Sequence, residues 1–114
     1  MEQPKVVMYA RFGVDVEQDY IDKVKKEMDE FLDMIGAKLM KQVWEIIPSG
    51  GESSELDYII DECMRYGWSI LTYDLSTLHE YKEGAIAIME DSADDSVPIF
   101  FIDAESAVKS IFDI

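Results

Sequence analysis

Short apolar runs alternate four times along this chain with longer segments whose apolar residues recur at every third or fourth position. Apolar runs of this length suit buried strands, and the three- and four-residue spacing indicates helices with one apolar face. The expected strands are residues 5–10, 39–47, 68–73 and 97–102. Because strands that alternate with helices form βαβ units, the pattern predicts an α/β fold with a mainly parallel four-stranded sheet flanked by helices.

The helix boundaries follow from capping residues. A first helix is expected over residues 15–35, with Gly36 at its end, and a second is expected to begin at Ser53 or Ser54 and to close at Gly67. Ser76 is the expected cap of a third helix, followed by a polar acidic loop over residues 91–96. The residues expected on the inner faces of these helices are Tyr20, Ile21, Val24, Met28, Phe31, Leu32, Ile35, Leu56, Ile59, Ile60, Cys63, Met64, Leu78, Tyr81, Ala85, Ile88 and Met89.

The end of the chain gives weaker signals. Pro98 indicates that the fourth strand begins late or lies at an edge of the sheet, because proline cannot donate to a strand ladder. Asp103 is the expected cap of a short final helix that carries Val108, Ile111 and Phe112. At 114 residues, with no linker or repeat, residues 1–114 are expected to form a single domain.

The charge is strongly acidic. Twenty-five acids against ten bases give a formal net charge of −15, and residues 57–114 hold thirteen of the acids with only three bases. Direct nucleic-acid binding is therefore disfavoured, since it depends on lysines and arginines that neutralise phosphates. Such a surface either keeps the protein in solution or meets a basic partner. The single cysteine, and the lack of a signal peptide or a long apolar run, predict a cytoplasmic protein with no membrane segment.

Polar residues follow each predicted strand, at the edge of a parallel sheet where ligands usually bind. Four acids there, Asp15, Glu45, Asp74 and Asp103, are weak candidates for a Mg²⁺ site, because hard cations prefer carboxylates. In so acidic a chain we interpret them first as helix caps and solvated loop ends. His79 is interpreted as a surface residue rather than a general base. No cofactor is predicted.

Three motifs in order resemble the N-terminal catalytic domain of the serine recombinases, the resolvases and invertases. Residues 9–13 (YARFG) are similar to the family's Tyr-x-Arg-Val-Ser, and residues 45–50 (EIIPSG) to its Asp-x-x-x-Ser-Gly. Residues 70–80 (ILTYDLSTLHE) are similar to its third strand and the following Asp/Ser-Arg-Leu-x-Arg. The resemblance implies a three-layer, resolvase-like fold.

The same resemblance implies a degenerate active site. In the family, a serine attacks a DNA phosphodiester and arginines stabilise the phosphoryl group; here Gly13 stands at the serine position. Ser53, Thr77 and Glu80 stand at the arginine positions, and Glu45 replaces an aspartate. The matching positions are Tyr9, Arg11, Gly13, Glu45, Ser49, Gly50, Ser53, Ser76, Thr77 and Glu80. The expectation is a pseudoenzyme rather than an enzyme.

We therefore expect a catalytically inactive domain that acts by protein–protein interaction. Its partner would be a second copy of itself, a true recombinase or another DNA-processing protein. A C-terminal DNA-binding module is not expected, because the sequence shows neither a basic arm nor a helix-turn-helix. Two alternatives remain open at this point: a metal-dependent phosphoryl-transfer enzyme built on the acidic loops, and an acidic mimic of DNA.

Overall fold

The computed structural model describes residues 3–103, which form one parallel sheet with helices on both faces. The strands lie in the order β2-β1-β3-β4, and every pairing between them is parallel. The elements are β1 (Lys5–Phe12), α1 (Gln18–Ile35), β2 (Lys38–Ile46), α2 (Leu56–Tyr66), β3 (Ser69–Thr72), α3 (Leu75–Leu78), α4 (Lys82–Asp94) and β4 (Ile99–Phe101). The predicted α/β class and the parallel four-stranded sheet are confirmed.

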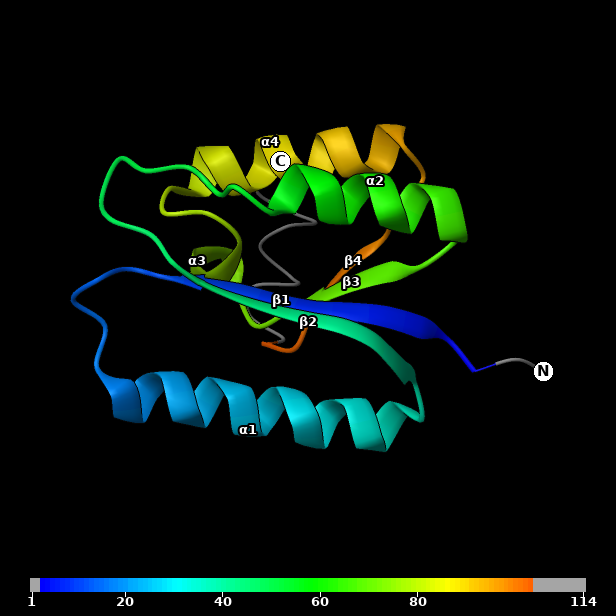
Figure 1. Cartoon of the computed structure of the whole chain (residues 1–114), viewed down its shortest axis with the longest axis horizontal. Helices are drawn as coiled ribbons and strands as arrows, with labels where there is room; N and C mark the ends of the chain where they lie inside the picture. The colour runs from blue at the N-terminus through cyan, green and yellow to red at the C-terminus, as the bar shows by residue number, and fades with distance from the viewer. Residues whose placement is uncertain (1–2, 104–114) are drawn as a thin grey trace.

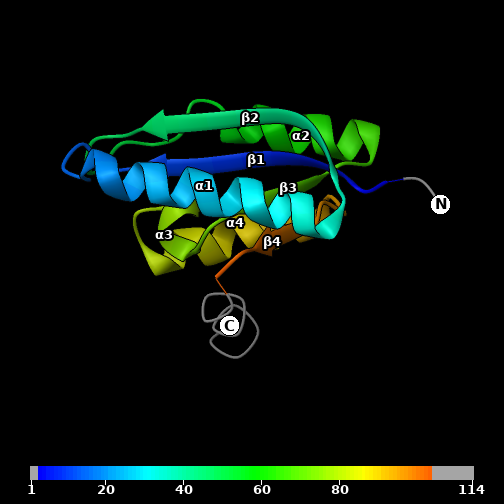
Figure 2. The ribbon, with the colours of Figure 1, turned by 90° about the horizontal axis from the view of Figure 1, so that it is seen from below.

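The structure has three layers: α1, the sheet, and the pair of helices α2 and α4 (Figure 1). Helix α1 covers one face of the sheet, and α2 and α4 lie side by side on the other (Figure 1; Figure 2 shows the α1 side). Val6 and Met8 of β1 pack in the cluster beneath α1, whereas Val7 and Tyr9 pack in the cluster beneath α2 and α4. The alternation of a strand therefore sends successive side chains into two separate cores.

Glycine ends α1 and α2 as expected. Gly36 after α1 and Gly67 after α2 adopt the left-handed conformation, with φ of 66° and 74°. Their backbone N–H groups donate to carbonyls of the preceding turn, which satisfies groups that a helix end leaves open. Helix α1 begins at Gln18, three residues later than predicted, because residues 14 and 15 form a turn.

The prediction for the third helix was wrong. Ser76 caps nothing; Asp74 caps the short α3, where its Oδ1 accepts a hydrogen bond from the Thr77 N–H at 3.0 Å. A break at His79 separates α3 from α4, which begins at Lys82. The predicted acidic loop was also wrong, since α4 continues through Asp94 with its acids on the surface. Composition alone suggested a loop, but exposed aspartates are compatible with a helix face.

Both expectations for Pro98 are confirmed: β4 begins only at Ile99 and lies at an edge of the sheet. The helix expected after Asp103 lies outside the described residues. Tyr20, Ile35 and Met64 were predicted to face inward but are exposed, because α1 and α2 contact the sheet along narrower stripes than their apolar residues span. Tyr81 is exposed because it lies in the break before α4 rather than on a helix face. Among residues 3–103, no helix is long and apolar enough to cross a membrane.

Cys63 packs in the core as predicted. It is buried among the residues beneath α2, and burial raises the pKa of its thiol to about 11. A thiol with such a pKa stays protonated near neutral pH and is a poor nucleophile. Cys63 is therefore a packing residue.

Two methionines of α1 test this packing. Met28 is fully buried and Met34 is 73% exposed. Met28→Ala should lower the free energy of unfolding by about 2–5 kcal/mol, because it leaves a cavity beneath the sheet. Met34→Ala is the matched control and should change it by less than about 0.5 kcal/mol in urea denaturation. Equal losses in the two variants would contradict the assignment of this face.

Candidate functional site

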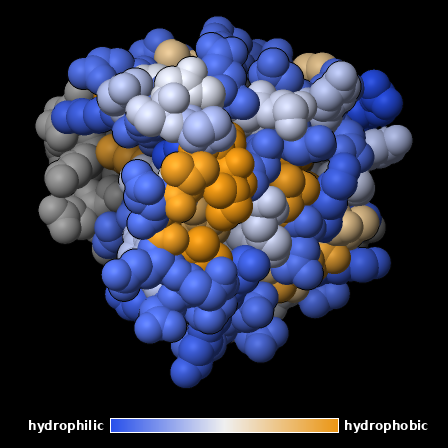
Figure 3. Space-filling view, turned by 60° about the vertical axis from the view of Figure 1, so that its left-hand side comes forward, coloured by the Kyte–Doolittle hydropathy of each residue, from blue (hydrophilic) through white to orange (hydrophobic). Residues whose placement is uncertain are grey.

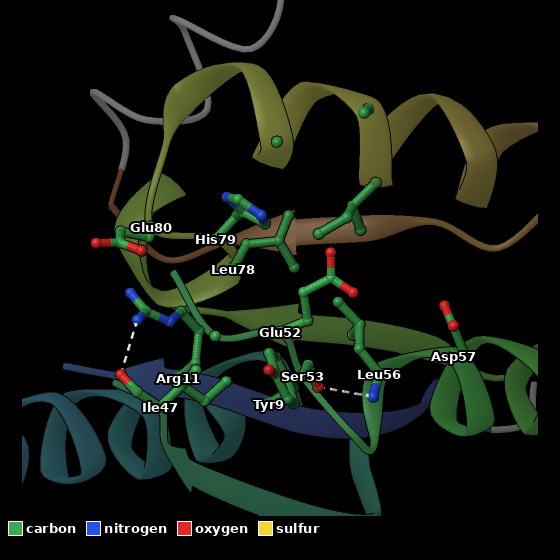
Figure 4. Close-up of a pocket in the computed structure, with 14 residues that line it drawn as sticks. Tyr9, Arg11, Ile47, Glu52, Ser53, Leu56, Asp57, Leu78, His79 and Glu80 are labelled. Carbon is green, nitrogen blue, oxygen red and sulfur yellow. Dashed lines mark hydrogen bonds between the residues drawn. The ribbon is translucent and has the colours of Figure 1, made fainter. Parts of the chain in front are cut away.

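A pocket of about 260 Å³ opens where β1 ends, between the β2–α2 connection and the α3–α4 segment (Figure 4). The apolar part of its wall comes from Ile47, Leu56, Leu78, Ala87 and Ile88. Its polar lining consists of Tyr9, Arg11, Glu52, Ser53, Asp57, His79 and Glu80. The pocket thus lies at the carboxyl ends of parallel strands, as expected for sites in such sheets.

The Glu45 carboxylate joins β1 to the loop before α2 beside the pocket. Its Oε1 accepts a hydrogen bond from the Tyr9 hydroxyl at 2.9 Å and another from the Ser53 hydroxyl, and its Oε2 accepts from the Ser54 N–H at 3.3 Å. The Ser53 oxygen in turn accepts the Leu56 N–H at 2.9 Å, at the start of α2. Burial, with the nearby Glu45, raises the pKa of the Tyr9 hydroxyl well above its ordinary value. This network fixes the loop before α2.

Arg11 is the buried cation of the pocket, with 8% of its surface exposed. Its Nη1 donates to the Ser76 carbonyl at 3.3 Å, and its Nη2 donates to the Ile47 carbonyl at 3.4 Å. The two ion pairs found among the described residues join other side chains, so no carboxylate neutralises Arg11 directly. The guanidinium thus joins the end of β2 to α3 through backbone carbonyls.

Glu80 occupies the hydrogen-bond donors of the loop after β2. Its Oε1 accepts from the Ser49 hydroxyl at 2.7 Å and its Oε2 accepts from the Gly50 N–H at 2.9 Å. These bonds, that of Gly50 above all, lower the pKa of the Glu80 carboxyl. Backbone and hydroxyl donors that converge in this way also suit a phosphate oxygen. Here a side chain of the protein itself fills the position.

Thr77 and Ser76 serve the α3 turn. The Thr77 hydroxyl is buried and accepts the N–H groups of Asp74, at 2.9 Å, and Tyr73, at 3.2 Å. The Ser76 hydroxyl donates to Asp74 Oδ1 at 2.6 Å rather than into the pocket. Both side chains therefore stabilise the connection between β3 and α3.

His79 lies against the first turn of α4. Its Nδ1 accepts the Tyr81 N–H at 3.0 Å, and a Cβ placed on Gly84 would come within 2.2 Å of the same ring atom. Any side chain at position 84 would have to displace the imidazole from this place. The ring was predicted to lie on the surface, but it is half-buried in the pocket wall.

The structure brings together only some of the predicted site residues. Tyr9, Arg11, Ser53 and Glu80 line the pocket, and Glu45, Ser49 and Gly50 contact them from the adjoining loops. Gly13, Ser76 and Thr77 are not among the lining residues. Sequence reasoning missed Glu52, Asp57 and Gly84, whose places depend on how α2 and α4 meet, a relation that no local motif encodes.

The weak metal candidates do not converge. Asp74 caps α3, Asp15 is exposed in the turn after β1, and Glu45 is held by Tyr9 and serine hydroxyls. Asp103 lines a different hollow, beside α1. Among residues 3–103, no three acidic, histidine or cysteine side chains gather in a group that could hold a metal ion.

Comparison with solved structures places this architecture. The chain aligns with the C-terminal catalytic domain of ISC1926 TnpA, an IS607-like serine recombinase, at a TM-score of 0.70 and 15% identity, over 96% of this chain and 76% of that one. It aligns with the N-terminal catalytic domain of TP901-1 integrase at a TM-score of 0.67 and 18% identity, over 95% and 87%. No protein-family model and no curated protein matches the sequence. The fold is therefore resolvase-like, as the three motifs implied.

The contacts of Glu80 should make the stability of the loop after β2 depend on pH. Because the folded pKa of Glu80 is lowered, its bonds stabilise the loop above the ordinary carboxyl pKa and are lost as the pH falls through the folded value. In a carboxyl ¹³C NMR titration, Ser49→Ala should raise the pKa of Glu80 toward its ordinary value. Ser54→Ala, whose hydroxyl contacts Glu45 instead, should leave it unchanged. An unshifted Glu80 titration in Ser49→Ala would disprove the contact.

Proposed function

We propose that this chain is a resolvase-like domain that does not cleave DNA and that acts by binding another protein. The observation that carries the proposal is the position of Glu80. Its carboxylate accepts the Ser49 hydroxyl and the Gly50 N–H, which are donors that a phosphoryl oxygen would need. By the resemblance, an arginine stands at position 80 in active recombinases. A carboxylate there repels the phosphate that an arginine would attract.

The other catalytic positions support the same conclusion. Gly13 carries no hydroxyl, so a covalent bond to a DNA phosphate cannot form at this position. Ser53 and Thr77, at two further arginine positions, bind Glu45 and the α3 turn, and neither supplies a cation. Loss of one stabilising donor typically lowers a rate by about 10²–10³. Loss of the nucleophile together with the cations removes the chemistry altogether.

The charge of the pocket points in the same direction. Three carboxylates line it, from Glu52, Asp57 and Glu80, against the single guanidinium of Arg11. That guanidinium already donates to two backbone carbonyls. An acidic pocket raises the electrostatic energy of any phosphate brought to it. The site therefore favours a cationic or neutral partner over DNA.

Apolar surface at the same end of the molecule supports protein contact. Figure 3 shows an apolar patch framed by hydrophilic residues on the side where the β1–α1 and β2–α2 connections lie. Val14, just after β1, is 60% exposed, and Ile46, the last residue of the neighbouring β2, is 57% exposed. Exposed apolar patches with polar rims mark interaction sites in many proteins.

Two alternative functions find less support. A metal-dependent enzyme needs converging ligands, and residues 3–103 contain no such group. A DNA mimic needs its acids on one face, but the acids of the second half that the structure describes divide between two sides of the sheet. Asp91, Asp94 and Asp95 lie with α2, whereas Asp103 lies with α1. Protein binding is the function that the geometry supports best.

Restoring the nucleophile tests the inactivity. Gly13→Ser should be tolerated, because an added Cβ would meet only Val16 Cγ2, at 3.9 Å. Neither the native chain nor this variant should nick a supercoiled plasmid or form a covalent adduct with a DNA duplex, as read by denaturing gel and intact-protein mass. An active serine recombinase is the positive control. A phosphoserine-linked adduct at position 13 in the variant would refute the proposal.

Complex formation tests the binding role. Mixed with a serine recombinase from the same cell, the chain should form a discrete binary complex in size-exclusion chromatography with light scattering. Ile46→Lys should weaken this complex, because it places a charge on exposed apolar surface at the end of β2, and Met34→Lys on α1 is the matched control. If the recombinase elutes unchanged, the heterodimer is excluded; if the chain also stays monomeric alone, so is self-association.

A further inference from the structure

Another hollow lies between α2 and α4, the two helices that Figure 1 shows above the sheet. Its volume is about 460 Å³. Five carboxylates line it: Asp57, Asp61, Asp91, Asp94 and Asp95. We call this hollow the acidic groove. Asp57 also lines the pocket at the end of β1, so the two hollows adjoin.

The lining of the acidic groove also includes two apolar side chains, Ile60 and Met64 of α2, which we call its apolar floor. Met64 is 49% exposed. Methionine is flexible and polarisable, and it recurs on surfaces that accept helices of varied sequence. Carboxylates around an apolar floor match a helix that has one apolar face and basic residues on either side of it.

The acids at the end of α4 stand where they weaken the fold. Asp91 and Asp94 occupy the end of α4, where the helix dipole disfavours negative charge, and the last turn holds no basic residue. Asp57 and Asp61 are one helical turn apart on α2, a spacing at which like charges repel. Arg65 pairs with Asp61 at 2.8 Å. Cations from a partner would relieve the remaining repulsion, which gives the groove a preference for basic ligands.

Other occupants fit less well. The five aspartates do not converge into a metal site, since no such group occurs in residues 3–103. The phosphates of a nucleic acid would be repelled by every carboxylate of the groove. A basic amphipathic helix complements both these carboxylates and the apolar floor.

We propose that the acidic groove between α2 and α4 binds a basic amphipathic helix of a partner protein. This inference rests on the proposed function, because it names the surface and the kind of partner through which the chain acts. Lysine or arginine side chains of the helix pair with Asp57, Asp91, Asp94 and Asp95. An apolar side chain of the helix covers Met64.

A synthetic peptide tests the groove without knowledge of the natural partner. The probe is a fluorescein-labelled helical peptide of leucine and lysine with all leucines on one face. A peptide of the same composition with a scrambled order is the control for amphipathicity. The whole chain should raise the fluorescence anisotropy of the first peptide at lower concentrations than that of the second.

Charge variants locate the binding. Asp91→Asn with Asp94→Asn should weaken binding of the amphipathic peptide by roughly fivefold or more at low salt, because two rim charges are lost. The same double variant should raise the melting temperature, because it removes the unfavourable acids at the end of α4. Asp29→Asn with Asp33→Asn on α1 removes the same charge from the opposite side of the sheet and should leave peptide binding unchanged.

A second pair of variants tests the floor. Met64→Ser should weaken peptide binding, whereas Met34→Ser, an equally polar change on exposed α1 surface, should not. No binding of the amphipathic peptide, or equal losses of binding in the groove and α1 variants, would refute the proposal that the groove binds a basic helix. These outcomes are separate from the plasmid and light-scattering experiments. A chain that binds its recombinase but ignores the peptide retains the proposed function and loses only the groove.

Discussion

The structure depends on the burial of β1 on both of its faces. Every residue from Val6 to Phe12 is buried, and successive side chains enter the core under α1 or the core under α2 and α4. A strand so enclosed leaves little freedom at its end. Tyr9 and Arg11 therefore reach the pocket in fixed positions, one bound to Glu45 and the other to two backbone carbonyls. The rigid strand positions the site, and the loops decide what the site can bind.

The loops around the pocket carry more negative than positive charge. In a phosphoryl-transfer site, preorganised donors and cations face the charge that develops on phosphate. Here the donors of Ser49 and Gly50 face Glu80, and further acids line the same pocket. The acidic groove beyond Asp57 extends this negative charge across α2 and α4. The charge of this surface is therefore unfavourable for phosphate, which is the basis of the proposed preference for basic protein segments.

The sequence predicts the sheet because strand and helix periods differ, and it predicts the ends of α1 and α2 because Gly36 and Gly67 have local signatures. It failed between α3 and α4, where the cap is Asp74 rather than Ser76. Three motifs located Arg11 and Glu80, yet not what they contact. Those partners come from chain segments far apart in sequence, and only the packing of β2, α3 and α4 brings them together.

The Arg11 side chain has a consequence for motion. It donates to the Ile47 carbonyl, just after β2, and to the Ser76 carbonyl in α3. One buried guanidinium therefore links two segments that are far apart in the sequence. Opening either connection exposes the same charge and breaks the same pair of bonds. The two segments should consequently open together, as one cooperative unit in native-state hydrogen exchange. Flexibility at one end of the sheet would then be shared between its loops rather than confined to each.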